Sequence, residues 1–204
     1  MVLNAQSSFD NPLSPDEDSG GYLAGQFLIA GPGMNDDRFK NTVIYMCVHD
    51  QEQAMGIIIN RPKDDLSLSE MLGNLEIHGD VTHEDNIVLY GGPVEQNRGF
   101  VLHSRDYFDP ETSLPLSKSL ALSTSKNILK SLVKDNAPKS AVLALGYAGW
   151  HAGQLETEIM QNGWFTAPAD EALIFSTDHD NKWKQALAKL GITPELLSAE
   201  AGNA

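Results

Sequence analysis

The chain has 204 residues, 41% of them apolar, and a formal net charge of −14 from 14 basic and 28 acidic residues. That length suits one domain with a sizeable core, and so acidic a chain repels nucleic-acid backbones unless basic residues cluster. A single cysteine, Cys47, excludes an internal disulfide framework. We find no membrane-length apolar run and expect no secretory signal, so the sequence predicts a cytoplasmic protein with no membrane partner.

The first half of the chain reads mainly as strands. Residues 1–20 are rich in Ser, Asp, Asn and Pro and are expected to form a flexible lead before a single domain over 21–198. Apolar and β-branched runs predict strands over 26–31, 42–49, 54–60, 86–90 and 99–103. Ser67 and Glu70 form a capping box, which predicts a short helix that begins there.

The second half alternates strands and helices. The expected strands cover 120–123, 141–145 and 171–176. Helices are predicted over 125–135 and over 153–162, the second stopped by Gly163, and a third is capped by Asp180. The end, 199–204, is expected to be frayed. The pattern favours an α+β fold, with one compact domain and a mixed, largely antiparallel sheet flanked by helices.

The densest motif is the joint 146–156, GYAGWHAGQLE, between an apolar strand and an amphipathic helix. Its three glycines allow close backbone approach, its aromatic side chains offer stacking faces, and His151 could serve as an acid or base. Two interpretations follow: a small-ligand site, or a tight packing joint in which the glycines make room for the Trp150 ring.

Two arginines at strand ends, Arg61 and Arg98, could clamp a carboxylate or phosphate, or each could pair with an acid such as Asp36 or Glu95. The glycine turns near them match no phosphate-loop fingerprint. Cys47 and His49, two apart on a predicted strand, would share a face, which permits thiolate chemistry. Burial of the cysteine is the plainer alternative. No histidine spacing indicates a metal site, so neither a metal nor another cofactor is expected.

Five segments together resemble one family. They are GQFLIAGPGM at 25–34, MGIIINRP at 55–62, YGGPV with RGFVLH at 90–103, GYAGW with GQLE at 146–156, and DEALIF at 170–175 with the Trp183 helix. In this order they resemble the AlgH/YqgE family of small bacterial proteins. The resemblance implies a compact α+β fold with a mixed sheet, and a candidate transcriptional regulator without an agreed ligand or reaction. The chain departs from the family at His151, where relatives carry a small residue, so a catalytic role for His151 is not expected.

The sequence leaves three hypotheses about the function of this protein. The first is a non-catalytic regulatory protein that acts through a protein partner or a small effector. The second is an enzyme on a small polar or anionic substrate, which uses Arg61, Arg98 and Glu156. The third is direct DNA binding, which the charge disfavours. No catalytic residue is assigned, and the candidate ligand- or partner-binding residues are Arg61, Arg98, Gly149, Trp150, Gln154 and Glu156.

Overall fold

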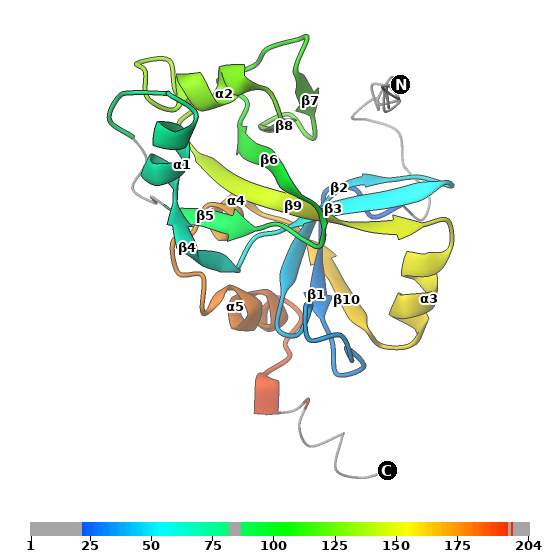
Figure 1. The fold of residues 1–204 in the computed structure, drawn as a ribbon. Helices are drawn as coiled ribbons and strands as arrows, with labels where there is room; N and C mark the ends of the chain where they lie inside the picture. The colour runs from blue at the N-terminus through cyan, green and yellow to red at the C-terminus, as the bar shows by residue number, and fades with distance from the viewer. Residues whose placement is uncertain (1–21, 82–86, 196, 198–204) are drawn as a thin grey trace, which may run out of the picture.

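The computed structural model describes residues 22–81, 87–195 and 197. The expected lead 1–20 and the expected frayed end 199–204 lie outside the described residues. One half of the sheet is an antiparallel set in which β1 (Gln26–Ala30) and β2 (Val43–His49) lead to β3 (Gln53–Ile58), and β10 (Trp164–Pro168) pairs with the outer side of β1. Figure 1 shows this half of the sheet on the side of the molecule that carries helix α3 (Gln154–Met160).

The other half of the sheet is built around the longest strands. Its strands are β4 (Pro62–Ser67), β5 (Ile87–Tyr90), β6 (Val94–Ser104), β7 (Ser113–Pro115), β8 (Leu120–Ser123) and β9 (Ala141–His151). The β5–β9 pair is parallel and the other described pairs are antiparallel. Strand β9 runs through both halves, because its first part pairs with β5 and β6 and its last part pairs with β3.

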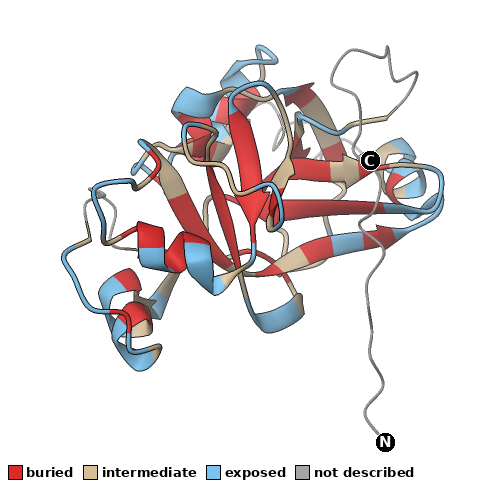
Figure 2. Cartoon of the chain, turned by 90° about the horizontal axis from the view of Figure 1, so that it is seen from above, coloured by how far each residue is buried: buried red, intermediate tan, exposed pale blue. Residues whose placement is uncertain are grey.

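The short helices that cover this curled sheet are α1 (Leu68–Asn74), α2 (Lys126–Ser131), α3 (Gln154–Met160), α4 (Glu171–Ile174) and α5 (Lys182–Ala188). The central core joins side chains from both sheet halves to α4 and α5. A second core lies under α3, and a third lies under α1 and α2. Figure 2 shows buried residues concentrated along the strands and exposed residues on the outer turns of the helices.

Helix α5 is fixed to the sheet by two side chains that reach backbone carbonyls. The buried Lys182 donates from Nζ to Ile59 O and to Ile174 O, both at 2.9 Å, and the Trp183 indole N–H donates to Ala30 O at 3.0 Å. These bonds satisfy carbonyls at the ends of β1 and β3 and at the end of α4. They position the Trp183 helix that the sequence predicted.

The predicted α+β class, with a mixed and largely antiparallel sheet in one compact domain, is confirmed. The capping box is present, since Ser67 Oγ accepts from Glu70 N and the Glu70 carboxylate accepts from Ser67 N. Among the described residues, no helix has the length and apolar character needed to cross a membrane.

Several expected elements are wrong in type or extent. Residues 171–176 were expected to be a strand, but 171–174 form α4 because the Asp170 carboxylate accepts from Leu173 N at 2.8 Å and caps a helix. The last strand is β10, which the sequence analysis missed, together with β4 and β7. Helix α3 ends at Met160, and the left-handed residue after it is Asn162, with a φ of 58°, rather than Gly163.

A buried chain of hydrogen bonds ties β6 to β7 and β8. The Nδ1–H of His103 donates to Ser104 O at 2.9 Å, because a carbonyl can only accept. The neutral ring therefore accepts at Nε2 from the Ser123 hydroxyl at 2.9 Å, and Ser123 in turn accepts from Ser113 at 2.7 Å. Each hydrogen in this chain has an acceptor only while His103 is neutral.

From these hydrogen bonds of His103 we predict that the protein loses stability in acid. Burial lowers the pKa of His103, and the smaller opposing effects of the bond to Ser104 and the charge of Asp106 do not cancel it. The unfolded chain then binds the proton more readily, so stability falls as the pH drops below about 6.5, by at most about 1.4 kcal/mol per pH unit. Urea unfolding from pH 8 to pH 5 should show this loss. The His103→Gln variant should lack that component, whereas His151→Gln, at an exposed position, should retain it; equal slopes in all three proteins would contradict the prediction.

Candidate functional site

The joint 146–156 is a change of strand partner rather than a strand-to-helix turn at Gly146. Strand β9 continues through the joint to His151, and α3 begins three residues later at Gln154. Before Gly146 the strand pairs with β5 and β6, and from Ala148 onward it pairs with β3. The extra strand length was missed because glycines usually interrupt strands in sequence patterns.

The glycines at this joint allow backbones to meet. A Cβ at Gly92 would lie 2.1 Å from the carbonyl carbon of Tyr147, and one at Gly91 would lie 2.2 Å from Gly146 O. Gly146 itself has a φ of +76°. Of the two interpretations of the joint, close packing therefore accounts for Gly91, Gly92 and Gly146.

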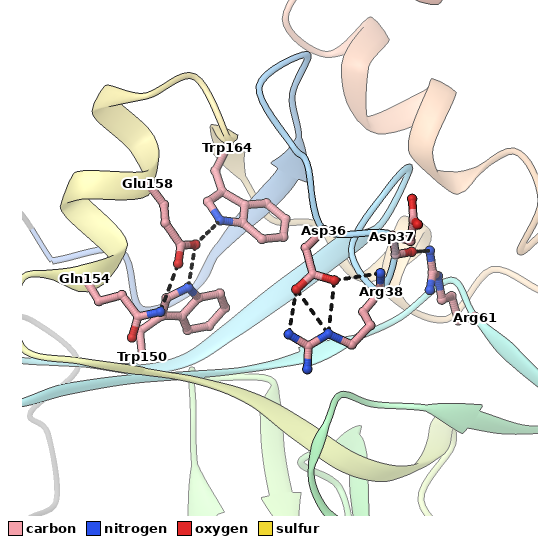
Figure 3. A network of polar contacts seen from close by, with 8 residues as sticks. All are labelled: Asp36, Asp37, Arg38, Arg61, Trp150, Gln154, Glu158 and Trp164. Atoms are coloured by element: carbon pink, nitrogen blue, oxygen red, sulfur yellow. Dashed lines mark hydrogen bonds and ion pairs between the residues drawn. The ribbon is translucent and has the colours of Figure 1, made fainter.

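One carboxylate, that of Glu158, lies at the centre of a polar cluster beyond the joint. Its Oε2 accepts the indole N–H of Trp150 at 2.9 Å and that of Trp164 at 2.8 Å, and its Oε1 accepts from Gln154 Nε2 at 2.9 Å (Figure 3). The two indole rings meet edge to face, with their centroids 6.1 Å apart. The cluster joins α3 to the neighbouring ends of β9 and β10, and the buried Leu155 packs beneath the helix.

The loop after β1 lies against the end of α3. Gly31 N donates to Gly163 O at 2.8 Å and Gly33 N donates to Asn162 O at 3.0 Å. A Cβ at Gly33 would lie 2.4 Å from Gln161 O, so the loop can approach this closely only with glycine there. The GPGM motif at residues 31–34 is therefore the part of the loop that packs against the end of α3.

The same loop carries an ion pair. The Arg38 guanidinium binds the Asp36 carboxylate through Nε at 3.0 Å and Nη2 at 2.6 Å (Figure 3). These hydrogen bonds hold the pKa of Asp36 below its usual value, although burial opposes them. Arg61 supports the loop from outside, since its Nη2 donates to Asp37 O and Lys40 O at 3.1 and 2.8 Å.

A pocket of about 410 Å³ lies between this loop and α3. Its lining comes from Gly33, Met34, Asn35, Asp36, Arg38 and Phe39 of the loop, from Pro93, from Gly149 and Trp150 of β9, and from Gln154, Glu158, Gln161 and Gly163 in and after α3. Three of the five segments that resemble the family, 25–34, 90–103 and 146–156, thus converge on one cavity. Its volume lies within the range of small-molecule sites, and its walls combine aromatic faces with amides and charges.

The structure brings together only some of the candidate binding residues. Gly149, Trp150 and Gln154 line the pocket, and Arg61 fixes its loop without lining it. Arg98 instead pairs with Glu95 at 3.0 Å, as one of the two sequence interpretations expected. Glu156 accepts from His49 Nε2 at 2.9 Å, away from the residues that line the pocket.

The side-chain hydrogen bonds of the site involve four residues that were absent from the candidates: Asp36, Arg38, Glu158 and Trp164. Glu158 carried a usable signal, because it lies four residues after Gln154 and so shares its helix face. The other three come to the site from β10 and from the loop after β1, and no spacing in the sequence indicates that contact.

Thiol chemistry at Cys47 is not supported by the geometry. The pairing of β2 with β3 shifts between Met46 and Val48, so Cys47 packs into the central core while His49 pairs with Ala54 on the opposite face. The prediction that the two side chains share a face is wrong, because this irregularity reverses the alternation. Burial raises the pKa of the Cys47 thiol to about 12, which leaves it protonated at neutral pH. In 22–81, 87–195 and 197, no group of three His, Cys, Asp or Glu side chains is placed to hold a metal ion.

The fold and the pocket define a small single-domain α+β protein whose curled sheet presents a mixed aromatic and polar cavity at one end. The family model described as AlgH-like matches residues 27–195, and the chain belongs to that family. UPF0301 proteins of Caulobacter vibrioides (strain NA1000 / CB15N) and Rhodopseudomonas palustris (strain BisB18) are 45% and 48% identical to it. These alignments cover 93% and 96% of this chain and 97% and 95% of the relatives.

Two solved structures share the fold. The solution structure of the AlgH protein from Pseudomonas aeruginosa matches with a TM-score of 0.74 and 40% identity, over 92% of this chain and 99% of that one. A crystal structure of a protein from Corynebacterium diphtheriae matches with a TM-score of 0.67 at 19% identity, over 93% and 96% of the two chains, which shows likeness of fold alone.

Proposed function

We propose that this protein is a non-catalytic regulatory protein that binds a small effector, or a segment of a partner protein, in the pocket between the 33–39 loop and α3. The observation that carries the proposal is the convergence of separate sequence motifs on one cavity of about 410 Å³. Backbone hydrogen bonds from the loop to residues 162 and 163 after α3, and the indole bonds to Glu158, hold its walls in place, so the cavity is preformed.

The alternative functions have less support. The enzyme hypothesis required Arg61, Arg98 and Glu156 to converge, but they bind the 37–40 backbone, Glu95 and His49 respectively. The charged side chains that line the pocket are Asp36, Arg38 and Glu158, and the first two are already paired with each other. Direct DNA binding remains disfavoured by the net charge of −14.

Variants of two arginines test this proposal. Arg38→Ala removes an exposed side chain from the pocket wall, and Arg98→Ala removes an equal charge that is held by Glu95 elsewhere. Gln154→Ala provides a second pocket variant on α3. Each protein is purified through a tag from the bacterium that naturally makes it. Native mass spectrometry then detects a small molecule bound to it, and partner proteins are recovered on the same tagged chain.

We expect Arg38→Ala and Gln154→Ala each to change the amount of the bound molecule or partner several-fold while they keep the wild-type circular dichroism spectrum. Arg98→Ala should leave that amount unchanged. Unchanged occupancy in both folded pocket variants, or an equal change in the Arg98 variant, would count against this pocket as the binding site.

A further inference from the structure

Glu158 is the charged side chain of the pocket wall that has no oppositely charged partner among the described residues. Its hydrogen-bond partners are the neutral donors of Trp150, Trp164 and Gln154. The half-buried carboxylate is therefore oriented by hydrogen bonds, but its charge is not neutralised. A carboxylate has about four acceptor directions, and three are used, so Oε1 retains capacity for one more donor.

The rest of the pocket does not supply a positive charge for that carboxylate. Arg38 directs Nε and Nη2 at Asp36, and this close pair is electrically balanced. The lining thus holds two carboxylates against one guanidinium, in a chain with a net charge of −14. An anionic occupant would meet this excess of negative charge, whereas a cation would be attracted to it.

The apolar part of the wall suits a cation on a hydrocarbon stem. Trp150 and Phe39 line the pocket with aromatic rings, and the Arg38 guanidinium, 5.8 Å from the centroid of the Phe39 ring, already shows a cation against this wall. Met34 and Pro93 add apolar surface for the methylene groups of such a stem. The volume of about 410 Å³ accommodates a side chain of this size with part of its backbone.

We propose that the occupant of this pocket inserts an alkylammonium group, which binds the Glu158 carboxylate while its stem packs on Trp150 and Phe39. The inference rests on the proposed function and adds the chemistry of the occupant. The group could belong to a free amine or to a lysine side chain of a partner, and the test separates these sources.

The hydrogen bonds suggest a variant that removes the charge and keeps the fold. Both indole N–H groups donate to the same oxygen, Oε2, so the single carbonyl oxygen of glutamine in Glu158→Gln can accept both. Rotation of the Gln154 amide then presents an oxygen to the new NH₂ group, in exchange for the bond that this oxygen accepts from the N–H of the exposed His151. Glu156→Gln is the matched control, because it removes the same charge from the same helix outside the pocket.

The probes are Nα-acetyl-lysine methylamide and n-butylamine, with Nα-acetyl-norleucine methylamide as the uncharged match of the first. The indole N–H signals of Trp150 and Trp164 in ¹H–¹⁵N spectra report on Glu158, and that of Trp183 serves as the internal reference. We expect saturable shifts of the first two signals with the lysine probe in the wild type and in Glu156→Gln. Affinity should fall about tenfold for the norleucine probe and for Glu158→Gln, and it should weaken with added salt.

Saturable binding of butylamine as well would identify a free amine as sufficient, and binding of the lysine probe alone would identify a lysine side chain; both results support the proposal. Equal binding of the lysine and norleucine probes, equal binding to the wild type and to folded Glu158→Gln, or no indole shift with either amine overturns it. Those results leave the proposed function to be decided by the Arg38 and Gln154 variants, so the two failures are distinguishable.

Discussion

Replacing Gly92 by alanine should destabilise the protein by about 3 kcal/mol or more, or prevent it from folding. The new Cβ would lie 2.1 Å from the Tyr147 carbonyl carbon and 2.4 Å from Ala148 N. Both obstacles are backbone atoms of β9, the strand that joins the two halves of the sheet, so neither can rotate away. Gly92 also has a φ of +151°, which L side chains rarely adopt.

Gly153→Ala separates steric clash from backbone strain. Gly153 also has a positive φ, of +74°, but nothing lies within 4 Å of its Cβ position. This variant should lose only about 1 to 2 kcal/mol, the cost of the left-handed conformation. The measurement is urea unfolding followed by circular dichroism. A Gly92→Ala protein as stable as Gly153→Ala would show that β9 can move aside at this joint.

Replacing Glu158 by alanine should cost about 3 kcal/mol of stability, because the indole N–H groups of Trp150 and Trp164 lose their acceptor. Both tryptophans are nearly buried, with 5% and 2% of their surfaces exposed, so water can replace the carboxylate only in part. Glu158→Gln retains an oxygen for both indoles and should stay within about 1 kcal/mol of the wild type.

The near-ultraviolet circular dichroism of the tryptophans, recorded beside urea unfolding, distinguishes these variants. Glu158→Ala should lose part of that signal at neutral pH before unfolding, since the carboxylate that holds both indole rings against α3 is gone. Equal stability of the alanine and glutamine variants would mean that the carboxylate is not what holds the two indoles.

The local elements that the sequence determined are those whose signals lie within a few residues. The capping box of Ser67 and Glu70 fixed the start of α1, and apolar β-branched runs placed β1, β2, β3 and β8 within one or two residues. The helix after the joint was predicted in the same way. Such patterns act through neighbouring backbone groups and need no partner elsewhere in the chain.

The candidate site was only partly predictable, because only some of its residues belong to one local motif. Gly149, Trp150 and Gln154 were chosen from a dense local motif, and they line the pocket. Asp36 and Arg38 face them from more than a hundred residues away, through a loop that Gly33 lets approach α3. Arg98 and Glu156 looked equally suitable in the sequence, but pairing with Glu95 and His49 removed them from the site.

The sequence by itself determined the family, the α+β class and the acidity of this protein, because each depends on composition or on motifs of a few residues. Only the tertiary structure shows that the glycines of the joint 146–156 lie where β9 changes its pairing from β5 and β6 to β3. It also showed that residues 171–174 form a helix rather than a strand. Finally, it made Glu158 the charge at the centre of the site, since the donors that hold it come from β9, β10 and α3, and only packing brings those elements together.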